Sequence, residues 1–183
     1  MIFIILIILL IIIGVILIIY SRYNKNLESN DFIEKHNKDY ETREHKPYAL
    51  LLSCIDYRLV DKTIRFINGK GLKNDFDYFI LAGAGLGVIN PTHYKDFDEW
   101  KKVYFQHIDI AISLHGIKEI ILVEHMDCGA YYIIYGKDIT AHEEHKKHVD
   151  TIMNMDMLIK NNYPELNFKG YIMHLDGHAE KII

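Results

Sequence analysis

The stretch Tyr48-Ala49-Leu50-Leu51-Leu52-Ser53 decides the fold class of this chain, because it is a short, unbroken apolar run without alternation. Such runs are typical of strands that are buried on both faces of a parallel sheet. A second run of the same kind is Glu119-Ile120-Ile121-Leu122-Val123. Two further strands are predicted over residues 77–81 and 169–175.

Helices are predicted in the segments between these strands. Apolar residues recur at three- and four-residue steps over residues 61–68, with Gly69 as the expected C-cap, and over residues 92–115. Thr140-Ala141-His142-Glu143 has the form of a capping box, which opens a helix that is expected to last to Asn161 or Asn162. Strands that alternate with helices predict an α/β fold with a mostly parallel β-sheet flanked by helices. In such sheets, ligands bind beyond the carboxyl ends of the strands.

Both cysteines of the chain lie at such strand ends. Cys54 begins the fragment Cys54-Ile55-Asp56-Tyr57-Arg58, and His125-Met126-Asp127-Cys128-Gly129 follows the second apolar run. If the two strands are neighbours, Cys54, His125 and Cys128 meet in one crevice. Two cysteines and one histidine are good zinc ligands, and a site with three protein ligands keeps its fourth position for water or substrate. The sequence therefore predicts a catalytic site with one zinc ion per chain.

Other cysteine and glycine chemistries fit the sequence poorly. A redox dithiol needs Cys-x-x-Cys, which is absent. The glycines from Gly83 to Gly87 resemble a dinucleotide loop, but the third glycine comes one residue early and the acidic residue expected further on is missing. A tight turn that brings backbone close to the metal pocket is the better interpretation of these glycines.

In combination, Cys54-x-Asp56-x-Arg58, the Gly/Ala-rich turn after the next strand, and His125-x-x-Cys128-Gly129 resemble the β-class carbonic anhydrases. The resemblance implies reversible hydration of carbon dioxide to bicarbonate by a zinc-bound hydroxide, in a homodimer. It also implies that Cys54, His125 and Cys128 are the zinc ligands and that Asp56 and Arg58 are the catalytic dyad. The chain departs from the family pattern at Tyr57, at Glu124 before the ligand histidine, and in the turn Leu81–Gly85.

The residues themselves suggest how such a dyad would work. Asp56 can accept a hydrogen bond from the nucleophilic water and orient it, while the planar guanidinium of Arg58 holds the carboxylate with two hydrogen bonds. Two alternatives remain open. One is a zinc hydrolase of another small linear substrate, carbonyl sulfide or carbon disulfide. The other is a catalytically inactive, zinc-stabilised binding module.

The N-terminal segment has a different character from the rest of the chain. Residues 1–20 are almost entirely apolar and carry no charged side chain, and about 20 such residues are enough to span a bilayer as a helix. Arg22 and Lys25 follow the span, so the catalytic domain is expected to face the cytoplasm. Residues 21–46 are expected to form a polar stalk, and residues 47–183 the zinc domain. The net charge of -4 is spread over charges of both signs, which argues against a nucleic-acid partner.

Other polar residues near the motifs are expected to have structural and not catalytic roles. His142, His145 and His148 follow one another at three-residue steps of one helix and are expected on its solvated face. Asp127 is expected to hydrogen-bond backbone within the ligand loop.

Overall fold

The computed structural model describes residues 12–23, 46–89 and 97–183 of the 183-residue chain. The chain divides into two compact units, Met1–Glu44 and His45–Ile183.

The predicted membrane anchor belongs to the first unit. Of that unit, residues 12–23 are helical, while residues 1–11 of the predicted anchor and most of the predicted stalk lie outside the described residues. Within the described ranges, no helix combines the length and apolar character that a bilayer crossing requires.

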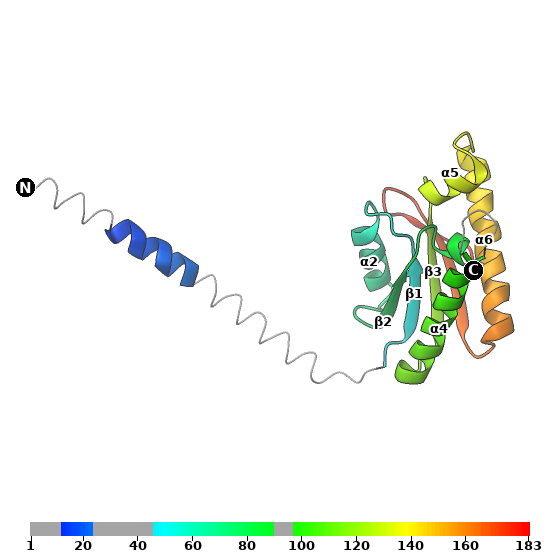
Figure 1. Ribbon diagram of the computed structural model, residues 1–183, viewed down its shortest axis with the longest axis horizontal. Coiled ribbons are helices and arrows are strands. Elements are labelled where there is room, and N and C mark those ends of the chain that lie inside the picture. The colour runs from blue at the N-terminus through cyan, green and yellow to red at the C-terminus, as the bar shows by residue number, and fades with distance from the viewer. Residues whose placement is uncertain (1–11, 24–45, 90–96) are drawn as a thin grey trace, which may run out of the picture. The chain divides into compact units, whose positions relative to one another are not determined.

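The second unit is built on one five-stranded sheet with the strand order β2-β1-β3-β4-β5 (Figure 1). The strands are β1 (Ala49–Ser53), β2 (Phe76–Ile80), β3 (Glu119–His125), β4 (Asn167–Met173) and β5 (Ala179–Lys181). The first four are parallel, and β5 runs antiparallel to β4. The prediction of an α/β fold with a mostly parallel sheet is therefore confirmed.

The two apolar runs of the sequence form the neighbouring central strands β1 and β3. Ala49 lies beside Glu119 and Ser53 beside Val123 in their register, and every residue of both strands is buried. Because the strands are parallel and end at almost the same level, the residues that follow them emerge at the same edge of the sheet.

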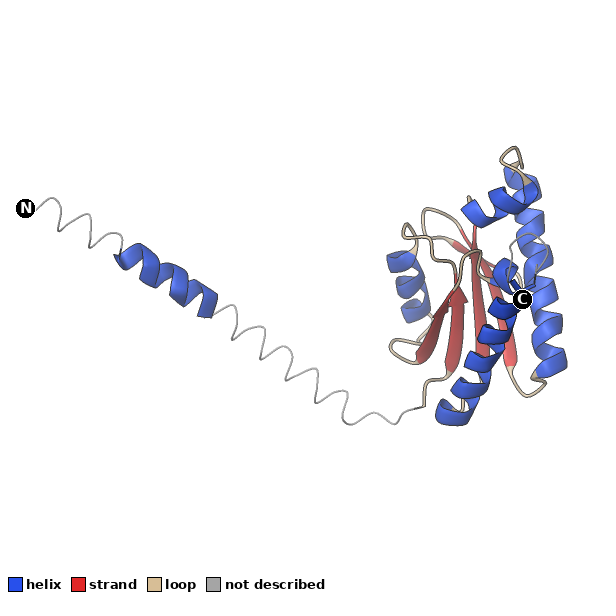
Figure 2. Cartoon of the chain, in the orientation of Figure 1, coloured by secondary structure: helices blue, strands red, loops and turns tan. Residues whose placement is uncertain are grey.

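Helices cover both faces of this sheet, with α2 on one side and α4 and α6 on the other (Figures 1 and 2). The helices are α2 (Val60–Gly69), α3 (Gly85–Ile89), α4 (Phe97–His115), α5 (Gly129–Tyr135) and α6 (Ala141–Asn162). Alternate strand residues supply the two cores, because successive side chains of a strand point to opposite faces. Leu50 and Leu52 join the larger core with α4 and α6, and Ala49 and Leu51 join the smaller one with α2.

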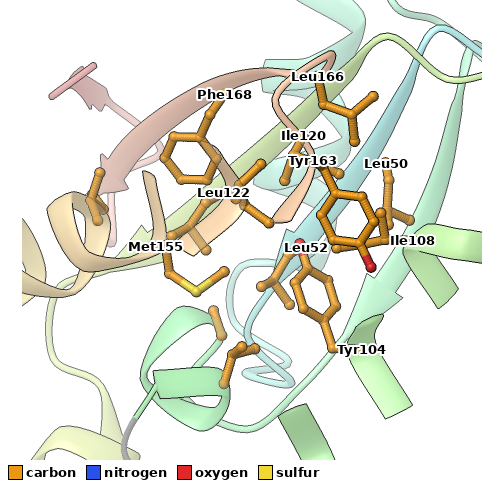
Figure 3. Close-up of a cluster of buried hydrophobic side chains, with 14 of the residues drawn as sticks. Leu50, Leu52, Tyr104, Ile108, Ile120, Leu122, Met155, Tyr163, Leu166 and Phe168 are labelled. Carbon is orange, nitrogen blue, oxygen red and sulfur yellow. The ribbon is translucent and has the colours of Figure 1, made fainter. Parts of the chain in front are cut away.

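Figure 3 shows the larger core, where the two long helices meet the sheet. Tyr104 and Ile108 of α4 and Met155 of α6 are fully buried there. This packing fixes α6 along the sheet, so its first turns lie near the carboxyl ends of β1 and β3.

The N-terminus of α6 follows the prediction from the sequence. The Thr140 hydroxyl accepts a hydrogen bond from the Glu143 backbone N–H, and the Glu143 carboxylate accepts one from the Thr140 backbone N–H, which completes the capping box. The helix ends at Asn162, before Pro164.

Other elements differ from the sequence-based prediction. The short helices α3 and α5 and the antiparallel strand β5 were not predicted. Gly69 is the last helical residue of α2, and the C-cap is Lys70. The long helix predicted from Thr92 is described from Phe97, because residues 90–96 lie outside the described residues.

Candidate metal centre

Cys54, His125 and Cys128 meet at the carboxyl edge of β1 and β3. Cys54 directly follows β1, His125 is the last residue of β3, and Cys128 is the N-cap of α5. Their ligand atoms all lie within 4.8 Å of one another, and the two sulfurs are 4.0 Å apart. Two sulfurs on one tetrahedral zinc ion lie about 3.8 Å apart, given Zn–S bonds of about 2.3 Å. The spacing therefore suits a small tetrahedral cation.

The histidine of this group has one ring nitrogen free to bind a metal. Its Nδ1 lies 2.9 Å from the Met126 carbonyl oxygen, to which an Nδ1–H donates. That hydrogen bond leaves the Nε2 lone pair toward the sulfurs, and Nε2 is buried without a hydrogen-bond partner among the described residues. A buried nitrogen of this kind costs free energy unless something binds it. Because a set of two sulfurs and one imidazole is typical of zinc, these residues fit that ion.

The contact between the two cysteines changes the pKa of each thiol. Either thiol can donate to the other across this contact. The contact with Cys128 lowers the pKa of Cys54, while burial opposes the shift and His125 adds to it. The same contact, together with burial, raises the pKa of Cys128. The Gly83 backbone N–H also points at the Cys54 sulfur, at 3.4 Å. This N–H would stabilise a thiolate at Cys54.

The carboxylate of Asp56 lies next to these ligand atoms and is held there by Arg58. Asp56 Oδ2 is 4.0 Å from His125 Nε2. Arg58 donates from Nη2 to Asp56 Oδ2 at 2.7 Å, from Nε to Oδ1 at 3.0 Å, and from its backbone N–H to Oδ1 at 2.9 Å. The side-chain hydrogen bonds from Arg58 hold the pKa of Asp56 below its usual value, although burial opposes them. The carboxylate is thus kept ionised beside the ligand group.

Arg58 is itself held from its other side by the ligand loop. Its Nη1 donates to Asp127 Oδ2 at 2.6 Å, and its Nη2 donates to the Asp127 carbonyl oxygen at 2.9 Å. The Tyr132 hydroxyl donates to Asp127 Oδ1 at 2.6 Å. The expectation that the Asp127 side chain serves the loop backbone is therefore wrong: it links Arg58 to Tyr132. In sequence, only the position of Asp127 between two ligands hinted at this role.

A cavity of about 310 Å³ opens beside the ligand group and is mostly apolar. Its lining comprises Cys54, Ile55, Asp56, Ala82, Gly83, Leu86, Gly87, Trp100, Cys128, Gly129, Ala130, Ile133 and Ile134. Gly83 has φ +71°, and a Cβ there would lie 2.8 Å from the Ala130 Cβ. The prediction of a tight turn close to the pocket is confirmed for Gly83, whereas Gly85 and Gly87 lie in the short helix α3.

A buried acid–base group that the sequence did not reveal lies behind the cysteine ligand. His148 is 0% exposed, between Glu124 at 1% and Glu144 at 2%. The prediction that His148 lies on a solvated helix face is wrong, because α6 turns this residue toward β3. His142 is exposed and His145 is partly exposed, where it bonds Glu180. Burial alone would lower the pKa of His148, but its contacts with the two carboxylates outweigh burial and raise it.

Comparison with known proteins gives one family and a consistent fold. Residues 44–182 match the family model described as "Putative carbonic anhydrase". An uncharacterized protein of Rickettsia bellii is 35% identical over 136 residues, covering 73% of this chain and 80% of the relative. An uncharacterized protein of Rickettsia conorii is 34% identical over 174 residues, covering 90% of this chain and 91% of the relative. A carbonic anhydrase of Helicobacter pylori is 33% identical over 89 residues, covering 48% of this chain and 35% of its own.

Two solved structures share the fold. The β-carbonic anhydrase CcaA has a TM-score of 0.52 at 16% identity, covering 88% of this chain and 93% of its own. The β-carbonic anhydrase CafA of Aspergillus fumigatus has a TM-score of 0.50 at 18% identity, covering 88% of each chain.

Proposed function

The chain belongs to the carbonic anhydrase family whose model it matches over residues 44–182, and from this we propose that it hydrates carbon dioxide reversibly to bicarbonate with one zinc ion. Cys54, His125 and Cys128 would hold the ion. The observation that carries the proposal is the grouping of a buried histidine with two cysteine sulfurs, all within 4.8 Å of one another, where His125 Nε2 also lies 4.0 Å from an arginine-clamped carboxylate. A purely structural metal site would have no use for that carboxylate.

The residues around the ligands support the chemistry of hydration. Zinc, when bound, supplies a Lewis acid that lowers the pKa of water toward neutrality. Asp56, kept ionised by Arg58, accepts a hydrogen bond from the nucleophilic water and orients it. The apolar cavity admits carbon dioxide, which carries no net charge, and keeps bulk water away from the reacting carbon.

Stopped-flow carbon dioxide hydration by the purified full-length chain tests this proposal, with zinc content measured on the same sample. We expect about one zinc per chain and hydration that disappears when a chelator removes the metal. Carbonyl sulfide and carbon disulfide serve as comparison substrates. A zinc-loaded chain that acts on none of the three would favour the binding module, and one that acts only on the sulfur compounds would favour the hydrolase.

We propose further that residues 1–20 anchor the chain in a membrane, with the zinc domain in the cytoplasm. The support is the composition of this segment and the positive charges of Arg22 and Lys25 beyond it.

We also propose a homodimer. Ile55 and Ile133 line the cavity yet are 62% and 66% exposed, and Tyr57 is 85% exposed. Apolar side chains that gather at an exposed rim mark an interaction surface. Sedimentation equilibrium of the full chain in detergent would show a mass of two chains; a single-chain mass at micromolar concentration would contradict the pairing.

A further inference from the structure

Three buried side chains, Glu124, His148 and Glu144, form a connected group directly behind the metal ligands. His148 Nδ1 lies 3.2 Å from Glu124 Oε2, and His148 Nε2 lies 3.5 Å from Glu144 Oε1, as an ion pair and not as a short hydrogen bond. The Tyr131 ring packs against the imidazole, tilted by 39°, with 3.8 Å between ring centroids. Two carboxylates are costly to bury without partners. His148 lies between them, and the Tyr131 hydroxyl also donates to Glu124 Oε2 at 3.3 Å.

At one end, the group reaches the backbone of a metal ligand. Glu144 Oε1 accepts a hydrogen bond from the Cys128 backbone N–H at 2.8 Å. Cys128 is the N-cap of α5 and makes no side-chain capping bond. Its sulfur position therefore depends on a backbone that Glu144 holds.

At the other end, the group reaches the turn that contacts the second cysteine. Glu124 Oε1 accepts a hydrogen bond from the Gly85 backbone N–H at 2.7 Å. Gly85 is the first residue of α3, and Gly83, in the turn directly before it, donates to the Cys54 sulfur. A Cβ on Gly85 would lie 2.8 Å from Glu124 Oε1 and 2.9 Å from the Leu122 side chain. Only a glycine lets the start of α3 approach the carboxylate this closely.

We propose that Glu144, oriented by His148, is a positioning residue that fixes the Cys128 ligand, while Glu124 on the same imidazole fixes the glycine turn against Cys54. The inference rests on the metal site of the proposed function. One buried imidazole thus couples the backbones beside both sulfur ligands, although none of the three side chains belongs to the ligand set.

The test compares Glu144→Leu, Glu144→Gln and Asp156→Asn in the purified full-length chain. Leucine removes the acceptor for the Cys128 N–H, and glutamine keeps a carbonyl oxygen for it. Asp156 is the matched control, because it is a buried carboxylate on the same helix that pairs with Lys160 at 2.6 Å. The readouts are the Zn²⁺ dissociation constant by chelator competition and the visible spectrum of the Co²⁺ form. The thiolate-to-cobalt charge-transfer band and the d–d bands of that spectrum report ligand number and geometry.

We expect Glu144→Leu to bind Zn²⁺ about 10–100-fold more weakly, as removal of a group that orients a ligand commonly does, and to alter the Co²⁺ d–d bands. Glu144→Gln and Asp156→Asn should keep the wild-type spectrum. If Glu144→Leu fails to fold, His148→Gln takes its place in the test. The glutamine amide nitrogen cannot reach both carboxylates at once. We therefore expect the same change in the Co²⁺ spectrum, with a smaller loss of Zn²⁺ affinity.

Three results would overturn the inference. The first is a wild-type spectrum and affinity in Glu144→Leu, or in His148→Gln where that variant decides. The second is equal losses in Glu144→Leu, Glu144→Gln and Asp156→Asn, which would indicate general destabilisation. The third is a wild-type chain that binds neither Zn²⁺ nor Co²⁺, which would overturn the proposed function as well. A wild-type chain that binds metal but hydrates nothing would overturn the proposed function alone.

Discussion

Arg58 is shared between two carboxylates, and this sharing explains how one half-buried cation controls a group beside the candidate metal ligands. Asp127 accepts a hydrogen bond from Arg58 Nη1, which holds the guanidinium in the orientation in which Nη2 donates to Asp56. A planar guanidinium suits such double contacts, whereas a lysine would provide only a point charge.

Replacing Arg58 with alanine should keep zinc but lose most hydration activity. The freed Asp56 carboxylate already lies 4.0 Å from His125 Nε2, so it can turn toward the ligands and compete for the open position. Loss of one preorganised partner commonly costs about 10²–10³ in rate, measurable as kcat by stopped flow. Arg65→Ala is the matched control, since Arg65 pairs with Asp61 on the exposed face of α2. Equal rates in Arg58→Ala and wild type, with zinc bound, would show that the dyad is not catalytic.

Each ligand substitution, Cys54→Ser, His125→Ala or Cys128→Ser, should lose zinc and lower the thermal midpoint, because metal-binding energy is also folding energy. Metal analysis and thermal unfolding of the same samples measure both effects. His115→Ala should keep zinc, since His115 pairs with Asp77 instead of the ligand group. Full zinc occupancy in all three ligand variants would refute the assignment.

At the residue scale, the grouping of Cys54, His125 and Cys128 could be predicted because they lie in two short motifs at strand ends. His148 could not be assigned in this way, since three histidines at three-residue steps look alike until the packing of α6 decides which of them faces the sheet. Only the structure also shows that Glu124, noted in sequence as a departure, accepts a bond from a glycine 39 positions away.

At the element scale, the first residue of α3, Gly85, is tightly packed against the side chains behind the site. Gly85→Ala would place a methyl group 2.8 Å from Glu124 Oε1 and 3.0 Å from the Thr151 methyl. Overpacking of this kind commonly costs about 1–3 kcal/mol. We expect a lower urea midpoint at an unchanged m value. Gly69→Ala is the control, because nothing lies within 4 Å of its Cβ position. A wild-type midpoint in Gly85→Ala would mean that the packing around this residue relaxes freely.

The elements that were predicted are those with long or unbroken apolar patterns. β1 and β3 were recognised because their residues are buried on both faces, and α6 because Thr140 and Glu143 mark its start. The helices α3 and α5 span only 5 and 7 residues, too short for periodicity to identify. Strand β5 has three residues and depends on β4 for its pairing.

At the scale of the whole molecule, the N-terminal segment and the zinc domain are expected to behave independently. The full chain should pellet with membranes and resist extraction by high salt, whereas a chain lacking residues 1–20 should stay in the supernatant. Ultracentrifugation followed by immunoblotting measures both. Hydration activity per zinc should be the same in the two forms, since the ligand group lies wholly in the second unit. Full-length chain in the supernatant would contradict the anchor.

The central pairing of β1 with β3 also has a kinetic consequence. Cys54 and Cys128 lie 74 positions apart. The chain between β1 and β3 contains α2, β2, α3 and α4, and it must close into a loop before the two strands can pair. Pairings between distant segments form slowly, because the intervening chain loses entropy before any contact compensates for it. During refolding in the presence of Co²⁺, binding of the ion by both sulfurs should therefore occur at the same time as the pairing of β1 with β3. The rise of the thiolate-to-cobalt charge-transfer absorbance would then measure the rate at which β1 and β3 pair.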